Sequence, residues 1–328
     1  MLQGKELILA TKPFAKEIRW KSWFYTLTAF TFLIASLLGT YFVPTIYGKI
    51  ISSIFSAIFL TRFFMIFHDY QHHSILQKSY FANFIFTIYG IYMLTPPSIW
   101  KRSHDFHHNN NAKLFSANIG SFPIMTKQKF LESSKSERRI YLAIRHPFNM
   151  IFAYLTMFIY GMCIQSFISS PKRHWDSLAT LIIHIGIAVT LFIYAGPLTW
   201  FLAFFLPFFI SHMIGAYLFY AQHTFPGVIF KSNEEWTYAN AALDSSSFLK
   251  MNPVLTWITA NIGYHHIHHL NARIPFYRLP ETMKSIKELQ EAKITSFKLS
   301  DIISCLRLKL WDSDQNRMIA LSELNLSK

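Results

Sequence analysis

Charged residues are scarce in this chain. Only 15% of its 328 residues are Asp, Glu, Lys or Arg, against about 25% in an average soluble protein, while 52% are hydrophobic. This balance excludes a disordered chain and argues against an ordinary soluble enzyme. Three long stretches contain no charged residue: 22–43, 148–170 and 177–230. Because about 20 apolar residues in a helix cross a bilayer, the first two each predict one span, and the third has room for two.

Cysteine is also scarce. Cys163 and Cys305 are the two cysteines of the chain, and neither belongs to a CxxC pair, so no disulfide framework is predicted. No cleavable signal peptide is expected, because the first apolar stretch is long and follows a polar lead of about twenty residues.

Acidic residues are outnumbered by basic ones. The chain has 31 Lys and Arg against 17 Asp and Glu, a net charge of +14. The basic residues gather before the first apolar stretch and in the loop 127–145, where they predict loops retained in the cytoplasm. The charge therefore does not predict a nucleic-acid partner.

The order of polar and apolar segments predicts one all-α domain, a multi-pass membrane helical bundle with a cytosolic cap. We expect 1–328 to divide into a transmembrane hairpin (22–67), a cytosolic segment (68–147), membrane segments (148–221) and a second cytosolic segment (222–328). Both termini are expected on the cytoplasmic side, together with the polar segments that contain most of the histidines.

Two features of the apolar segments limit the number of crossings. Segment 81–94 is short and ends before Pro96, so it is predicted to be buried or interfacial without crossing. The polar segments that carry the histidines must lie on one side of the membrane to form one site. An even number of crossings must therefore separate them, so only two of the segments 148–167, 178–196 and 198–221 are expected to cross. The sequence leaves open which of the three stays at the interface.

Histidine, in contrast, is abundant. Eleven of the 15 histidines fall in an HxxxHH pattern at 68–73, two HxxHH patterns at 104–108 and 265–269, and one isolated position, His223. Residues i, i+3 and i+4 share a helix face, and neutral imidazole is a good ligand for transition metals. More than six candidate ligands are too many for one ion, so the patterns predict a site for two metals. The candidate ligands are His68, His72, His73, His104, His107, His108, His223, His265, His268 and His269.

Other residues around these patterns have different expected roles. Asp69 and Asp105 follow the first histidine of their patterns, where a carboxylate can orient a ligating imidazole. His266 is displaced by about 100° from His265 on a helix and is expected to point away from the metals. The remaining histidines lack ligand spacing and are expected to be structural or interfacial: His146, His174, His184 and His212.

The order of the patterns around membrane hairpins resembles the integral-membrane fatty acid desaturases. The third pattern carries most of the resemblance, with Ser245-Ser246-Ser247 and Trp257 before it, the run Asn261–Leu270 around it and Tyr277-Arg278-Leu279-Pro280 after it. This run is similar to bacterial acyl-lipid desaturases of the omega-6 (Δ12) type. The segment 220–223 resembles the one that supplies an additional metal-binding histidine, and Leu306–Asp312 looks like that group's C-terminal tail.

The resemblance implies a di-iron centre that uses O2 to introduce a double bond into a membrane-lipid acyl chain. By this resemblance, every candidate histidine above except His72 is expected to bind iron. His72 is expected either to bind iron or to form a hydrogen bond with a histidine that does. Two departures limit it: Thr224–Gly227 replaces the acidic residues of close relatives, and no His-Pro-Gly-Gly haem motif is present. Electrons would therefore come from a separate donor, a ferredoxin or cytochrome b5.

Three other functions remain open from the sequence. Hydroxylation or a carotenoid reaction could use the same scaffold. A transition-metal transporter would place acidic residues or histidines inside the spans, which carry almost no polar or charged residue of this kind; His184, His212 and Arg62 are the candidates. A non-enzymatic membrane scaffold would need no dense set of histidines. The sequence does not predict the position of the double bond, the length of the acyl chain or the acyl carrier.

Overall fold

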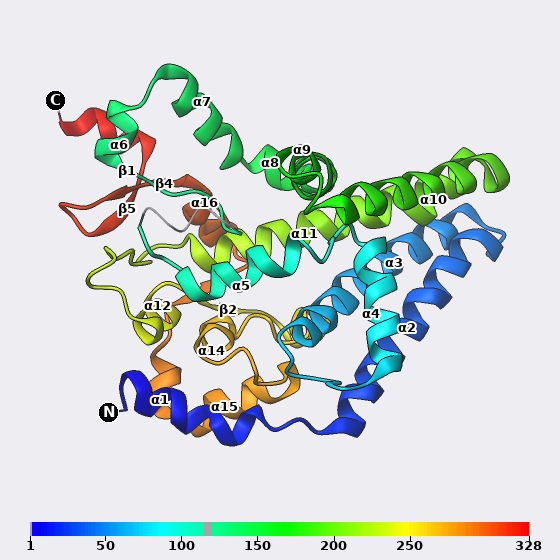
Figure 1. The fold of residues 1–328 in the computed structure, drawn as a ribbon, viewed down its shortest axis with the longest axis horizontal. Coiled ribbons are helices and arrows are strands. Elements are labelled where there is room, and N and C mark those ends of the chain that lie inside the picture. The colour runs from blue at the N-terminus through cyan, green and yellow to red at the C-terminus, as the bar shows by residue number, and fades with distance from the viewer. Residues whose placement is uncertain (1, 115–119, 328) are drawn as a thin grey trace.

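The computed structural model describes residues 2–114 and 120–327, and Figure 1 shows them as an elongated bundle of helices with both chain ends on the same side. The predicted all-α class is confirmed, since helices make up nearly all of the regular structure. Three described helices are long and apolar enough to cross a membrane: Arg19–Phe42, Ile46–Gln71 and Trp175–His223. We call residues 2–18, 95–114, 120–146 and 224–327 the cap.

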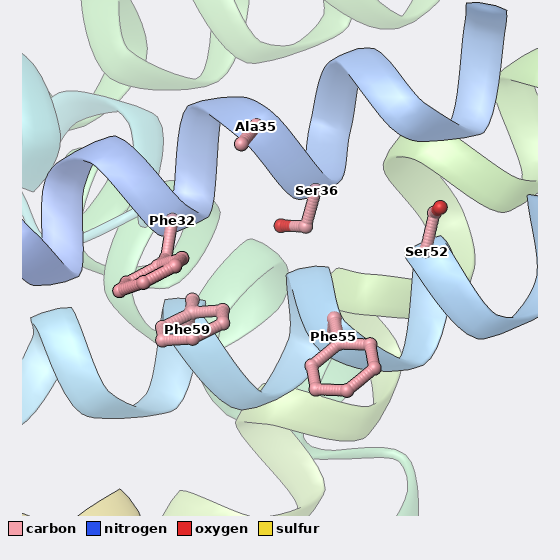
Figure 2. Close-up of a pocket in the computed structure, with 6 residues that line it drawn as sticks. All are labelled: Phe32, Ala35, Ser36, Ser52, Phe55 and Phe59. Carbon is pink, nitrogen blue, oxygen red and sulfur yellow. The ribbon is translucent and has the colours of Figure 1, made fainter. Parts of the chain in front are cut away.

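The N-terminal hairpin pairs α2 (Arg19–Phe42) with α3 (Ile46–Gln71). Small residues let the two helices approach closely: the Oγ atoms of Ser36 and Ser56 are 3.1 Å apart, and a Cβ on Gly39 would lie 2.6 Å from Ser52 Oγ. A groove of about 230 Å³ lies on this hairpin, and Figure 2 shows a close-up of it. It is lined by Phe32, Ala35, Ser36, Ser52, Phe55 and Phe59.

The helix α4 (Tyr80–Tyr92) runs across the hairpin in Figure 1 and has 13 residues. At 1.5 Å per residue it is about 20 Å long, too short for a hydrocarbon core of about 30 Å. The chain then turns back at Leu94, which has a φ of 57°, and leads into the cap helix α5 (Trp100–Asn110). The expectation that 81–94 does not cross agrees with this length.

The apolar segments after residue 147 have unequal lengths. Segment 148–167 becomes α8 (Pro147–Ile151), the π-helix η2 (Tyr154–Gln165) and α9 (Ser166–Ser169), which Figure 1 shows nearly end-on. The long α10 (Trp175–Trp200) contains a break at Gly196, where φ is 81°, followed by Pro197. The chain there reverses into η3 (Phe201–Phe205), which packs against α10, and α11 (Leu206–His223), which packs against α3.

Aromatic side chains mark both ends of the long helices. Trp20 and Tyr41 are both exposed and lie 21 residues apart on α2, a rise of about 31 Å. Trp175 and Tyr194 are likewise exposed near the two ends of α10. This spacing matches a hydrocarbon core of about 30 Å, and exposed Trp and Tyr are typical of membrane–water interfaces.

The cap contains short helices and two small sheets that the sequence did not predict. Its remaining helices are α1 (Gly4–Thr11), η1 (Lys12–Ala15), α6 (Lys127–Glu132), α7 (Lys135–Ile144), α12 (Tyr238–Asp244), α13 (Pro253–Ile258), α14 (His265–Leu270), η4 (Phe276–Arg278), α15 (Leu279–Ser285), η5 (Lys287–Glu291), α16 (Leu299–Arg307) and η6 (Leu321–Ser327). One sheet pairs β1 (Met125–Thr126) in parallel with β4 (Leu308–Asp312), which pairs antiparallel with β5 (Arg317–Ala320). The other pairs β2 (Phe248–Lys250) with β3 (Ile294–Ser296) in parallel.

Arg62, a buried arginine in the middle of α3, joins the hairpin to the cap. It is buried, and its guanidinium lies 3.9 Å from the centroid of the Trp257 ring and 5.8 Å from that of Tyr25. It also donates a hydrogen bond to the backbone carbonyl of Trp257. Because Trp257 belongs to α13, this contact holds the segment that precedes the third histidine pattern against α3.

His184 and His212, inside the spans, bind the end of α4. His184 has Nδ1 3.3 Å from Tyr92 O, and His212 has Nε2 3.3 Å from Met93 O and Nδ1 2.7 Å from Phe208 O. The last carbonyls of a helix have no partner within it, and in an apolar environment they need donors from elsewhere. These contacts agree with the structural role expected for the two histidines, and within the described residues neither belongs to a group of metal-ligand type.

We expect His212→Phe to lower the stability of the protein without removing bound metal. A neutral imidazole has one N–H, so the substitution takes a donor from one buried carbonyl, that of Met93 or that of Phe208, which costs about 1–3 kcal/mol. Thermal unfolding in detergent, with metal content measured in parallel, tests this. His212→Gln, which keeps an N–H donor, should be closer to native; a Phe variant as stable as the native protein would contradict the assignment.

Candidate metal centre

Nine histidine side chains, from the cap and from the ends of α3 and α11 beside it, meet in two groups. The first group contains His68, His72, His104, His108 and His268, and the second contains His107, His223, His265 and His269. Within each group the candidate ligand atoms all lie within 4.8 Å of one another. Neither group includes a carboxylate or a cysteine.

Helical spacing explains why these residues converge. On α5, His104, His107 and His108 share one face, and on α14 the same spacing places His265, His268 and His269 together. His68 lies in the last turn of α3, and His72 is the residue that follows the helix, four positions on. His223 is the last residue of α11. Both α5 and α14 contribute to both groups.

The distances between ring nitrogens fit a cation at the centre of each group. His104 Nε2 lies 2.8 Å from His68 Nε2 and 2.9 Å from His72 Nε2, and His223 Nε2 lies 2.8 Å from His265 Nε2 and 3.1 Å from His107 Nε2. Hydrogen bonds alone do not explain these contacts, because one hydrogen can bridge only one pair of nitrogens and the Nε2 atoms of His104 and His223 are each close to two others. Nitrogen ligands about 2.1 Å from an ion, by contrast, lie about 3 Å from one another.

The protonation of these histidines also suits metal binding. Burial, followed by repulsion from neighbouring imidazoles, holds the pKa of His108 and His269 well below the usual range for histidine. Burial likewise lowers the pKa of His104 and His268. The rings are therefore neutral near pH 7, with the lone pairs that ligation requires, and all-imidazole sets suit iron, zinc, copper or nickel.

Neighbouring groups fix the orientation of several rings. His107 Nδ1 lies 2.6 Å from Ser121 Oγ, and His223 Nδ1 lies 3.1 Å from Ser245 O. The indole of Trp100 stacks on His104, with ring centroids 5.0 Å apart. Sequence reasoning missed Ser121 and Trp100, and no spacing signal points to Ser121, because it lies in a loop beyond α5.

The two predicted carboxylates differ in position. Asp69 is buried, with Oδ1 3.8 Å from His68 Nδ1, and its Oδ2 accepts a hydrogen bond from the backbone N–H of Phe276. It therefore ties the first pattern to the segment after the third. Asp105 instead forms an ion pair with Lys101 at 2.8 Å, so it orients no ligand in this structure.

Two histidines of the patterns lie outside both groups. His266 is fully buried and donates from Nε2 to the carbonyl of Leu289 at 3.0 Å, as its helical phase predicts. His73, named as a candidate ligand from the resemblance, is exposed. Its position has a local cause: α3 ends at Gln71 and His73 has a φ of 56°, so the chain turns away from the two groups after His72.

A cavity of about 430 Å³ reaches both groups. His68 and His104 of the first group and His265 of the second line it, and most of its other walls are apolar residues from α3, η2 and α11, such as Phe64, Phe158 and Leu218. We call it the inner cavity. An apolar space beside two metal-binding groups suits an apolar substrate held close to a metal.

These features define the class of protein. Its long apolar helices are typical of a membrane protein, and its two histidine groups beside an apolar cavity suit metal chemistry on an apolar molecule. A family model for fatty acid desaturases matches residues 44–298. The chain belongs to the fatty acid desaturase family and is a desaturase enzyme.

The curated relatives include a fatty acid desaturase of Bacillus subtilis, 30% identical over 269 residues, which are 82% of this chain and 76% of that protein. The sn-1 oleoyl-lipid 12-desaturase of Synechocystis is 24% identical over 270 residues, 82% of this chain and 76% of the relative. The oleoyl-12-hydroxylase of Ricinus communis is 24% identical over 261 residues, 72% of this chain and 64% of the relative.

Proposed function

We propose that the chain introduces a double bond into the acyl chain of a membrane lipid, with one iron ion held by each histidine group. The observation that carries the proposal is the inner cavity, which brings an apolar space to ring nitrogens of both groups. The proposed ligands are the nine grouped histidines, and His73 is left out because its side chain is exposed.

Bound iron would supply the oxidising chemistry: O2, two external electrons and two protons are consumed, two hydrogens leave adjacent methylenes, and two waters form. The protein would hold the acyl chain in position beside the iron and exclude water from the site. Phe64, Phe158 and Leu218 would exclude water from the inner cavity, and burial lowers the pKa of His104 on its wall, so this imidazole adds no charge there. Trp100, stacked on His104, fixes one edge of the ligand set beside the substrate.

The proposed orientation places the histidine groups and both described chain ends on the cytoplasmic side. The loop between α2 and α3 and the turn from α10 into α11 lie at the opposite end of the bundle (Figure 1), and Lys49 is the basic residue near them. The cap contains most of the basic residues, among them Lys127, Lys135 and Arg139. This asymmetry favours a cytoplasmic cap. A separate ferredoxin or cytochrome b5 would then reach it from the cytoplasm.

Two glycines on spanning helices offer a matched test. Gly215 of α11 lines the inner cavity, whereas Gly186 of α10 is exposed, and a Cβ at either position would meet no atom within 4 Å. We expect Gly215→Leu to lower desaturation about tenfold or more, because the side chain fills the space for the substrate. Gly186→Leu makes the same change in helix propensity outside the cavity and should be near native.

The measurement is product analysis of host lipids at matched expression, with and without O2, and iron per purified chain. Iron content should be the same in both variants and the native protein. A Gly215→Leu variant with native turnover would show that the acyl chain lies elsewhere. An active native protein that contains zinc but no iron would refute the iron assignment, and hydroxy fatty acids as the main product would favour the hydroxylase alternative.

A further inference from the structure

A second hollow adjoins the inner cavity on the side of the cap helices. It has a volume of about 380 Å³ and is lined by Ser121, Phe122, Ala143, Ile144, Asn149, Thr156, Met157 and Tyr160. We call it the outer groove. Ser121 and Met157 line both spaces, so the two adjoin along these two side chains. The outer groove therefore extends the space beside the histidines toward the surface.

The position of the outer groove suggests access from the bilayer. It lies between the last turn of α7, α8 and the start of η2, where the chain passes from the cap into its apolar segments. Ile144 and Tyr160 on its walls are exposed, as is the neighbouring Phe148. Exposed apolar and tyrosine side chains at such a boundary are typical of contact with the lipid interface.

The polar groups of the outer groove suit an ester and its glycerol. Asn149 uses one Nδ2 hydrogen to bind Ile144 O at 2.8 Å, which leaves a second N–H donor for a carbonyl oxygen. The hydroxyls of Thr156 and Tyr160 donate to protein oxygens, to Phe152 O and Gln165 Oε1 respectively. Their oxygens keep lone pairs that can accept hydrogen bonds from a hydroxyl or a lipid-bound water.

The charge of the outer groove distinguishes among acyl carriers. None of its described lining residues is charged, and a phosphorylated nucleotide carrier would need cations to neutralise its phosphates. A glycerolipid keeps its charged headgroup in the aqueous layer above the membrane, so that only its ester and glycerol groups would reach the outer groove. The lining therefore fits a bilayer lipid better than a soluble acyl thioester.

We propose that the outer groove holds the ester-linked glycerol end of a bilayer glycerolipid, whose acyl chain passes between Ser121 and Met157 into the inner cavity. This proposal rests on the proposed function and adds to it the site where the glycerol end of the lipid binds. Met157 forms part of the passage, and its unbranched side chain can change rotamer as an acyl chain passes.

The test fills the outer groove from α7. Ala143→Phe places a ring in the groove at an exposed position, so the fold should not change, and Ile140→Phe adds a ring one turn earlier on the same helix, outside the lining. Both iron-loaded proteins are assayed in nanodiscs of palmitoyl-oleoyl phosphatidylglycerol with reductant. Native mass spectrometry counts the lipids that each purified protein retains.

We expect Ala143→Phe to lower lipid desaturation at least about tenfold and to lose a retained lipid, while Ile140→Phe behaves as the native protein. Equal lipid turnover and retention in the two variants would overturn the proposal, as would a native protein that desaturates oleoyl-CoA in detergent but no lipid. If the native protein desaturates neither substrate, the proposed function fails, and lipid retention still decides whether the outer groove binds lipid.

Discussion

Replacing His268 by alanine is expected to abolish turnover, by more than about 100-fold, and to lower the iron bound per chain. His268 lies in the first group, with Nε2 3.2 Å from His108 Nε2 and its ring 4.6 Å from that of His68. No other side chain in the described part of α14 can take its place, because His265 and His269 belong to the second group. Loss of a positioned imidazole removes a ligand outright.

The matched control is His266, two residues earlier on the same helix. It is equally buried, but its Nε2 donates to Leu289 O, so His266→Ala should lower thermal stability by the cost of one unpaired carbonyl, about 1–3 kcal/mol. Iron content and measurable turnover should remain. Iron per chain and product yield are compared at matched expression, and equal effects of the two substitutions would show that the helical-phase assignment is wrong.

Two adjacent histidines provide an even closer comparison. We expect His72→Ala to abolish activity and reduce bound iron, because His72 Nε2 lies 2.9 Å from His104 Nε2 within the first group. His73→Ala should leave iron and turnover within about twofold of native, since an exposed side chain outside the groups contributes little.

Iron analysis of the two purified variants, followed by turnover with a chemical reductant, separates the roles. A chemical reductant is needed because an exposed histidine beside the site could also contact the protein donor. Loss of iron in His73→Ala with retention in His72→Ala would reverse the assignment and restore the ligand set that the resemblance implies.

The choice between His72 and His73 shows what the sequence could and could not predict. The i and i+4 spacing of His68 and His72 already favours His72 if the helix continues that far. The family pattern pointed instead to His73. The outcome depends on where α3 ends, at Gln71, and on the positive φ of His73, which local sequence does not determine.

Elsewhere, the predictable features were those governed by periodicity or length. The HxxHH patterns at 104–108 and 265–269 form helices with the expected faces, and segment 81–94 forms a helix too short to cross. The two sheets escaped prediction, because their strands are two to five residues long and, except for the β4–β5 pair, join segments far apart in the chain. Ser121 escaped for the same reason: only tertiary packing brings its loop to His107.

The pairing of His68 with His268 has a consequence for biosynthesis. Two hundred positions separate these residues, yet they share one group, and α5 and α14 serve both groups. A ribosome completes the N-terminal hairpin and α5 long before it makes α14, so the first two patterns wait without their partners while the later helices enter the membrane. Neither of the two proposed ions could be enclosed until His268 and His269 are in place, which would make metal loading a late step of maturation and not a guide for helix insertion.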